Sequence, residues 1–495
     1  MSETTPARGD GGRRREPRRQ GPQRRKPATP RPGPSEVQPA RRIAREVIEA
    51  VRADDAYANL LLPGKIAAAG LAPADAALAT ELTYGTLRLR GYYDAVIERA
   101  SGRPIDEIDG AVRDVLELGA HQILSMRVAQ HAAVNESVEL ARQVASRSAT
   151  GFVNGVLRAI TRTAPEAWVA QLTEGAGSDD ERLALATSHP AWVVRAFRRA
   201  LVADGVAADA VAAELDDLLQ ADNTPARLSL AGLPGLYAGS DAESGLQPAA
   251  LSPIGFVAPS GDPAGLAAVR EGVLRVQDEG SQLAALALSR ARDIDEGERW
   301  LDLCAGPGGK TAVLAAEARL AGATVVANEP VPARAGLVRR AVAAVPEAPT
   351  VWERDGTTIG DSEREAFDRI LVDAPCTGLG ALRRRPEARW RKTPADVAEL
   401  VALQQALLDS AVKALKPGGL LAYVTCSPHV AETRGQVQGL LRRWPDELTQ
   451  LDTQAVLRDV AGDTLTLGAP DPAAQLWPHR NTTDAMFIAL FEKTP

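Results

Sequence analysis

The sequence predicts a multidomain protein with an all-α N-terminal domain, a small α+β intermediate domain and a C-terminal α/β domain. Apolar residues repeat at helical spacing up to about residue 165, and no strand alternation interrupts them. A mixed stretch rich in Gly, Pro and Ser follows. From residue 298, short apolar strands alternate with helices, as in mostly parallel sheets covered on both faces. We place the three domains at residues 37–165, 166–290 and 291–495.

Residues 1–36 are rich in Arg, Pro and Gly and nearly free of large apolar residues, which predicts a disordered basic tail. They carry a net charge of +6, so the rest of this chain of net charge −7 carries −13. The tail is either an arm that touches RNA phosphates or a solubilising segment. Because the remainder is acidic, any surface that binds nucleic acid must be a local patch.

Apolar periodicity predicts the helices of the first two domains, beginning with Ile43, Val47, Ile48 and Val51 on one face. The further helical stretches are about 73–100, 107–125, 133–147 and 150–162 in the first domain, and 190–203, 207–220 and 280–291 in the second. Short strands and loops are expected over 231–265, with a further strand over 273–278.

In the C-terminal domain the predicted strands are 299–303, 323–328, 350–353, 368–373, 419–425 and 485–492. One connecting helix is well marked, because Thr393 suits the N-cap, Pro394 suits the first helical position, and 417–419 (Pro-Gly-Gly) ends it. The carboxyl ends of parallel strands line the binding crevice of such a sheet. Residues that follow the strands are therefore the candidates for a functional site.

A glycine-rich turn follows the first of these strands and opens a helix. It comprises Cys304, Ala305, Gly306, Pro307, Gly308, Gly309 and Lys310. Its backbone N–H groups can approach a ligand closely. A phosphate-binding P-loop would need Gly at position 304, and a dinucleotide fingerprint would need Gly at position 311, where Thr stands. The corresponding turn of S-adenosylmethionine methyltransferases tolerates this pattern, so we favour that class.

Acidic residues follow the next two strands. Glu329 lies 23 residues beyond Gly306, where a carboxylate can accept both ribose hydroxyls of a nucleoside cofactor. Asp355 is placed to face the adenine of such a cofactor, although an Asp-Gly pair is also common in plain turns.

Two cysteines and an aspartate follow the later strands. Asp373 and Cys376 come after one strand, and Cys426 ends another. Methylation of cytosine at C5 gives both thiols a role. A thiolate that adds to C6 makes C5 nucleophilic toward a methyl sulfonium, and a base must then remove the C5 proton so that the thiol can leave. A carboxyl group near N3 or the exocyclic amine would stabilise charge on the ring.

A basic segment follows Cys376 closely. Its six cations and one aromatic residue are Arg383, Arg384, Arg385, Arg389, Trp390, Arg391 and Lys392. Cations suit phosphates and an aromatic ring suits base stacking, so the segment predicts RNA held beside the site. A solvated basic loop is the alternative interpretation.

The composition argues against several classes of protein. The three cysteines, Cys304, Cys376 and Cys426, form no CxxC pair, so neither a disulfide framework nor a zinc module is indicated. No apolar run approaches the roughly 20 residues needed to span a bilayer, and the N-terminus has no apolar signal region. We expect a cytoplasmic monomer with no metal and no membrane partner.

The C-terminal motifs resemble a known family, the RsmB/Sun (NOL-NOP-Sun) RNA 5-methylcytosine methyltransferases. The matching stretches are 301–311 (LDLCAGPGGKT), 373–378 (DAPCTG), 424–427 (VTCS) and 476–479 (LWPH) with Asp484. The pairing of a Pro-Cys with a Thr-Cys motif is specific to that family. Three positions differ from its usual pattern: Thr377 for Ser is conservative, Gly306 for Ala should be harmless, and Ala485-Met486 for Gly-Phe touches only the last strand.

The earlier parts of the chain also resemble that family. Residues 133–141 (AVNESVELA) and 151–158 (GFVNGVLR) resemble the helical NusB-like RNA-binding domain, and 188–192 (SHPAW) and 275–281 (RVQDEGS) resemble the family's intermediate region. The resemblance implies a NusB-like domain, an α+β linker and RNA-recognition subdomain, and a Rossmann-like S-adenosylmethionine methyltransferase domain.

The resemblance also implies roles for the matching residues. Cys426 would be the covalent nucleophile, Cys376 would aid product release, and Asp373 would approach both cofactor and cytosine. The residues of the 304–310 turn, together with Glu329, Arg334, Asp355 and Asp373, would hold S-adenosylmethionine.

The predicted function is methylation of C5 of a cytosine in 16S ribosomal RNA by S-adenosylmethionine, through a covalent cysteine–C6 intermediate. Two alternatives stay open. One is the same chemistry on transfer RNA. The other is a NusB-like RNA-binding or assembly factor with a vestigial methyltransferase half, against which the intact Cys376, Cys426 and Asp373 argue.

Overall fold

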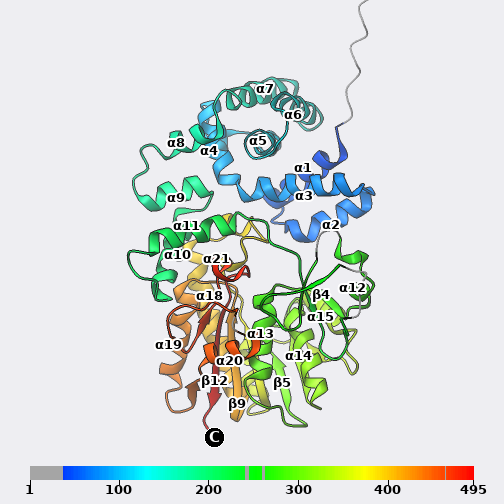
Figure 1. The fold of residues 1–495 in the computed structure, drawn as a ribbon, viewed down its shortest axis with the longest axis vertical. Coiled ribbons are helices and arrows are strands. Elements are labelled where there is room, and N and C mark those ends of the chain that lie inside the picture. Colours follow the sequence, from blue (N-terminus) through cyan, green and yellow to red (C-terminus); the bar gives the residue numbers. More distant parts are fainter. Residues whose placement is uncertain (1–36, 240–244, 259–261, 463) are drawn as a thin grey trace, which may run out of the picture. The chain divides into compact units, whose positions relative to one another are not determined.

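The first part of the chain is entirely helical, as predicted (Figure 1). The computed structural model describes residues 37–239, 245–258, 262–462 and 464–495, so the predicted basic tail lies outside the described residues. The helices up to residue 160 are α1 (Pro39–Ala53), α2 (Ala58–Ala69), α3 (Pro73–Arg88), α4 (Arg90–Ser101), α5 (Gly110–Leu124), α6 (Gln130–Val144) and α7 (Arg147–Ile160). Ile43, Val47, Ile48 and Val51 of α1 lie in their common core, which confirms the predicted apolar face.

Two details of this helical region differ from the sequence prediction. The helix expected over 73–100 is broken at Leu89 into α3 and α4, and α2 was not predicted. The apolar residues of α2 do not fall on one face, so periodicity could not reveal it. It is held by burial of Ala58 and Leu62 instead.

The intermediate region combines helices with a small antiparallel sheet, which confirms its α+β character. Its helices are α8 (Pro165–Thr173), α9 (Asp179–Thr187), α10 (Ala191–Ala203), α11 (Val211–Asp222) and the short α12 (Ala267–Glu271). Its strands are β1 (Ser229–Gly232), β2 (Gln247–Pro248), β3 (Gly255–Val257) and β4 (Leu274–Val276), in the order β2-β3-β1-β4.

The C-terminal region is built on an eight-stranded sheet with the order β10-β12-β9-β8-β5-β6-β7, while β11 pairs with β12. The strands are β5 (Arg299–Asp302), β6 (Thr324–Asn328), β7 (Thr350–Trp352), β8 (Phe367–Asp373), β9 (Leu415–Thr425), β10 (Leu448–Gln450), β11 (Ala474–Gln475) and β12 (Phe487–Lys493). Strands β7, β6, β5, β8 and β9 are parallel, whereas β12 is antiparallel to its neighbours.

Helices cover both faces of this sheet, as predicted (Figure 1). On β8, Leu371 packs into the core with α13 (Glu279–Arg290), α14 (Gly309–Leu320) and α20 (Thr453–Ala461). Its neighbours Ile370 and Val372 pack on the other face, with α18 (Pro394–Ala414) and α19 (Arg434–Arg443). Successive strand residues point to opposite faces, so both layers are anchored by the same strands.

The start of β9 corrects one predicted boundary. The strand begins at Leu415, which pairs with Phe367, and not at residue 419. Pro417, Gly418 and Gly419 therefore lie inside the strand, beside an irregularity in its pairing with β8. The start of α18 agrees with prediction, because the Asp396 carboxylate accepts hydrogen bonds from both the backbone N–H and the hydroxyl of Thr393.

The strand order fixes where a ligand can bind. The chain moves outward from β5 through β6 to β7 and then returns to the other side of β5 with β8. Such a reversal opens a crevice at the carboxyl ends of the strands. The residues that follow β5, β6, β8 and β9 meet at this edge. None of the helices in the described ranges combines the length and apolarity required to cross a membrane.

Candidate active site

The two predicted catalytic cysteines face each other at the carboxyl edge of the sheet. The sulfur atoms of Cys376, after β8, and Cys426, after β9, are 3.5 Å apart. Both are free, half-buried thiols. The hydrogen bond from Cys376 lowers the pKa of Cys426, and the same contact together with burial raises the pKa of Cys376. The thiolate form is therefore more favoured at Cys426 than at Cys376, and a nucleophilic cysteine must be a thiolate.

A lysine–aspartate pair lies beside these sulfur atoms. Lys310 Nζ donates a hydrogen bond of 2.7 Å to Asp373 Oδ2, which joins the glycine-rich turn to the end of β8. Burial acts to lower the pKa of Lys310, but the charge of Asp373 and its hydrogen bond outweigh it and raise that pKa. The charge of Asp373 acts to raise the pKa of Cys426, and the smaller effect of Lys310 acts to lower it. The predicted cofactor turn and the predicted nucleophile are thus coupled electrostatically.

The glycine-rich turn brings its backbone against the end of β6. A Cβ on Gly306 would lie 2.1 Å from Glu329 Oε2, so a larger residue there would make the Glu329 carboxylate shift. Arg334 closes the contact, because its Nη2 donates to the Gly306 carbonyl at 3.0 Å and lies 3.4 Å from Glu329 Oε2. Gly308 has a φ of +101°, and a Cβ there would lie 2.5 Å from that of Ala341. Gly308 is therefore required for the conformation of the turn, and Gly306 allows its close approach to Glu329.

The other turn residues and Asp355 have plainer environments. Ala305 is buried and its N–H donates to the Asn328 carbonyl, Pro307 is exposed, and Gly309 begins α14. Burial raises the pKa of Cys304 well above its usual range, so Cys304 is a neutral thiol and not a third nucleophile. Asp355 Oδ1 accepts hydrogen bonds from the N–H and hydroxyl of Thr357, which lower the pKa of Asp355. Asp355 thus forms a turn, and its contact with adenine stays a prediction.

A buried carboxylate that sequence reasoning missed holds both cysteine loops. Glu432 is fully buried at the end of a short helical turn, Val430–Glu432. Its Oε1 accepts the N–H of Thr377 at 2.8 Å, and its Oε2 accepts the hydroxyls of Thr377 at 2.6 Å and Ser427 at 2.7 Å. Thr377 follows Cys376 and Ser427 follows Cys426. An acid six residues after a cysteine has no distinctive pattern, so only the fold identifies it.

A second buried cluster borders Cys426. Asp484 is buried and forms an ion pair with Arg384, whose Nε donates at 3.0 Å. The N–H of Asp484 donates to Asp278 Oδ1 at 3.1 Å. Burial and then the neighbouring Asp484 raise the pKa of Asp278 to about 7. Arg384 therefore neutralises a carboxylate beside the site.

The predicted RNA-binding segment divides into buried and exposed members, which corrects its interpretation as a uniform basic surface. Arg389 is fully buried, and its Nη1 donates to the carbonyl of Ser188 at 3.0 Å and to Asn223 Oδ1 at 2.9 Å. Arg383 is also buried and donates to the Thr482 carbonyl at 2.6 Å. Loops and helix ends offer these guanidinium groups acceptors inside the protein, so neither group is placed to meet a phosphate. The members that keep exposed surface are Arg384, Arg385, Trp390, Arg391 and Lys392.

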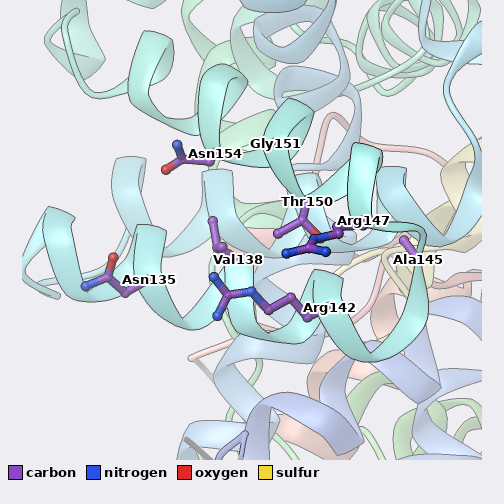
Figure 2. A pocket seen from close by; sticks show the side chains of 8 residues that line it. All are labelled: Asn135, Val138, Arg142, Ala145, Arg147, Thr150, Gly151 and Asn154. Carbon is purple, nitrogen blue, oxygen red and sulfur yellow. The ribbon is translucent and has the colours of Figure 1, made fainter. Parts of the chain in front are cut away.

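A concavity of about 750 Å³ lies elsewhere, between α6 and α7 (Figure 2). Its lining residues are Asn135, Val138, Arg142, Ala145, Arg147, Thr150, Gly151 and Asn154. They include none of the cysteines, carboxylates or turn residues described above. The candidate active site therefore remains at the edge of the large sheet.

The fold and this site define the class of the protein, a methyltransferase joined to a NusB-like helical domain, and comparisons with known proteins agree. Residues 290–492 match the family model described as 16S rRNA methyltransferase RsmB/F, and residues 38–162 match the NusB family. The chain belongs to the RsmB/F family of 16S rRNA methyltransferases, which confirms the resemblance read from its motifs.

Relatives of this family match along most of their length. The chain is 46% identical to Rv1407 of Mycobacterium tuberculosis strain H37Rv, provisionally named a methyltransferase, over 92% of this chain and 97% of that protein. It is 32% identical to ribosomal RNA small subunit methyltransferase B of Erwinia tasmaniensis, over 92% of this chain and 98% of that protein. The crystal structure of PH0851 shares its fold, with a TM-score of 0.73 and 22% identity over 93% of this chain and 100% of that one.

Proposed function

We propose that the protein methylates C5 of a cytosine in 16S ribosomal RNA, with S-adenosylmethionine as the methyl donor and Cys426 as the covalent nucleophile. The observation that supports this reaction is the pair of sulfur atoms 3.5 Å apart at the crevice of the sheet. A single cysteine there could be a buried apolar residue. Two facing thiols beside a charged Lys310–Asp373 pair fit a reaction in which one thiol attacks and the other assists its departure.

The residues at the sheet edge fit S-adenosylmethionine. The Gly306 backbone lies so close to Glu329 that the carboxylate can reach a ligand seated on the turn, where ribose hydroxyls are the natural donors. The residues that would hold the cofactor are Cys304, Ala305, Gly306, Pro307, Gly308, Gly309, Lys310, Glu329, Arg334, Asp355 and Asp373. When bound, S-adenosylmethionine supplies a methyl group on a positively charged sulfur.

The side chains of this chain would act on the cytosine as follows. The Cys426 thiolate forms a bond to C6, and the electron pair of the C5–C6 double bond becomes available at C5. Within the described residues Asp373 accepts a hydrogen bond only at Oδ2, so Oδ1 can accept a hydrogen bond from the exocyclic amine of the cytosine. After C5 is methylated, loss of its proton to a base restores the double bond and expels Cys426. Cys376 lies beside the departing sulfur and assists its release.

The choice of ribosomal RNA rests on the family and on relatives such as the small subunit methyltransferase B of Erwinia tasmaniensis. The exposed members of the basic segment, Arg384, Arg385, Trp390, Arg391 and Lys392, would contact this RNA beside the site. The reaction would take place in the cytoplasm, where bacterial ribosomes are made.

Bisulfite sequencing of ribosomal and transfer RNA tests this proposal in cells with the gene, without it, and with Cys426→Ala alone. Loss of one protected cytosine in 16S RNA, in both the deletion and the variant, is the expected result. Loss in transfer RNA would move the reaction to that substrate. No loss in either RNA would favour an RNA-binding or assembly factor with a vestigial methyltransferase half.

A further inference from the structure

An exposed aromatic side chain of the helical domain lies against the basic segment of the catalytic domain. Tyr57 immediately precedes α2 and is 44% exposed, and Leu60, one turn further, is 69% exposed. Apolar side chains that stay exposed beside charged groups often mark contact surfaces. We call Tyr57, Leu60, Arg385 and Arg391 the Tyr57 surface.

Two guanidinium groups hold the Tyr57 ring. The Arg391 guanidinium carbon lies 4.7 Å from the ring centroid, and that of Arg385 lies 5.8 Å from it. Arg391 also donates hydrogen bonds to the carbonyls of Val51 and Ala56, which fix the loop before α2. Cations over an aromatic face are attracted to it. The ring is therefore held in one place while nearly half of the residue stays open to solvent.

The two arginines keep their positive charge available to a partner. Among the described residues, no carboxylate forms an ion pair with Arg385 or Arg391, and the buried Nε of Arg385 has no hydrogen-bond acceptor. The buried carboxylate of Glu387 interacts electrostatically with both arginines without forming an ion pair, and its Oε1 accepts the N–H of Ala58. Two cations beside an exposed ring are complementary to a partner that combines phosphates with flat bases.

The Tyr57 surface is linked to the candidate active site through the basic segment. Arg385 directly follows Arg384, which forms an ion pair with Asp484 and whose pKa is raised first by Asp484 and also by Cys426. Earlier in the same segment, the Gly380 N–H donates to the Cys426 carbonyl at 2.9 Å. A strand of nucleic acid that enters the site can therefore extend along this segment to Tyr57.

We propose that Tyr57 is a stacking platform for an unpaired base of the RNA substrate near the target cytosine, with Arg385 and Arg391 contacting the adjoining phosphates. This inference rests on the proposed function, because it takes RNA as the substrate. Asp54 and Asp55, exposed in the same loop, would repel phosphates, so the RNA backbone passes on the arginine side of the ring.

Binding of a mixed-sequence, single-stranded oligoribonucleotide tests the proposal, with Tyr57→Ala, Tyr57→Phe and the unmodified full chain compared by fluorescence anisotropy. Tyr57→Ala weakens binding by about 5- to 150-fold, the range expected for one stacked base. Tyr57→Phe retains the ring and binds within about 2-fold of the unmodified chain. Leu320→Ala, at an apolar residue of α14 that is 59% exposed, is the matched control and leaves binding unchanged.

The same variants separate stacking from other roles of Tyr57. Melting temperature and S-adenosylmethionine affinity stay unchanged in Tyr57→Ala if the residue acts only on RNA. A fully paired duplex of the same sequence shows no dependence on Tyr57, because its bases are not free to stack. Unchanged binding of the single strand by Tyr57→Ala, or equal loss in Tyr57→Phe, overturns the proposal.

A protein partner at the Tyr57 surface would give a different result. Loss of methylation by Tyr57→Ala on small-subunit particles, with unchanged affinity for the free oligonucleotide, would mean that the surface binds protein, and it overturns the proposal. A separate measurement shows whether the proposed function itself fails. If Cys426→Ala still methylates RNA, the nucleophile is wrong, whereas the affinity difference between Tyr57→Ala and Tyr57→Phe still decides the stacking.

Discussion

Two regions of the molecule that hold charged groups differ in how accessible those groups are. At the sheet edge, the Asp373 side chain is 27% exposed although it is paired with Lys310. We call the buried contact of Arg389 with Ser188, Asp222 and Asn223 the helical junction. There Arg389 and Asp222 are almost completely buried, and Arg389 donates its hydrogen bonds to protein acceptors. A charge that a substrate can reach serves chemistry, whereas an enclosed charge serves the fold. Substitutions at the edge should therefore change the reaction, and substitutions at the junction should change stability.

The largest expected effect is on the reaction, from Cys426→Ala. Loss of the nucleophile should lower turnover by at least about 1,000-fold. Because the sulfur is not needed for the turn or for Glu329, S-adenosylmethionine affinity by calorimetry and the melting temperature should stay close to those of the unmodified protein. Methylation that persists at a comparable rate would remove Cys426 from the mechanism.

Cys376→Ala should also act on chemistry, but at a later step. Without the thiol that faces the departing sulfur, a covalent RNA adduct should accumulate and appear as a denaturation-resistant shifted band on a gel. The double variant Cys376→Ala, Cys426→Ala is the matched control and should form no band. A band of equal intensity in the double variant would mean that the adduct does not involve Cys426.

At the junction, Arg389→Ala should lower the free energy of unfolding by about 3 to 5 kcal/mol, because it leaves the buried Ser188 carbonyl and Asn223 Oδ1 without their charged hydrogen-bond donor. Chemical denaturation measures this loss, and the exposed Arg364→Ala is the control. Turnover per folded molecule should fall far less than in Cys426→Ala. A stable Arg389→Ala protein with no activity would mean that Arg389 serves the reaction and not the stability of the fold.

The smallest effect concerns Asp222 and depends on pH. Burial raises the pKa of Asp222 to about 7, and within the described part of the chain neither carboxylate oxygen accepts a hydrogen bond, although His189 Nε2 lies 3.7 Å from Oδ2. The folded state thus holds a proton that the unfolded chain loses near pH 4, so stability falls as the pH rises from about 4 to about 7. Asp222→Asn should therefore add roughly 3 to 4 kcal/mol at about pH 8 and little near pH 4. Urea denaturation at both pH values measures this, with the exposed Asp209→Asn as control.

The sequence was most informative where the sheet topology determines which residues lie together at one edge. Parallel strands place the residues that follow them at one edge, so the meeting of Asp373, Cys376 and Cys426 could be predicted from the strand pattern alone. The glycine-rich turn at residues 304–310 could also be predicted, because the spacing of its glycines reflects the conformation of its backbone. The fold class and the family, which were predicted from these strands and motifs, were both confirmed.

The sequence was least informative where burial depends on distant segments. Arg389 and Arg391 stand two positions apart in one basic run, yet one is enclosed by the Ser188 and Asn223 region and the other lies over Tyr57. Glu432 is an isolated acid in the sequence and a shared acceptor of both cysteine loops in the fold. No local pattern distinguishes these environments, because the partners lie on other elements.

Gly380 has a consequence for how substrate choice and catalysis are linked. Its N–H donates to the Cys426 carbonyl, its carbonyl accepts the N–H of Ala485, and a Cβ would lie 2.1 Å from the Ala485 oxygen. Because these segments are joined by backbone hydrogen bonds, a displacement of the Gly380 segment also displaces the backbone of Cys426. If the proposed function holds, an RNA that binds residues 383–392 in the wrong position would displace the backbone of Cys426, so incorrect substrates would react more slowly as well as bind more weakly.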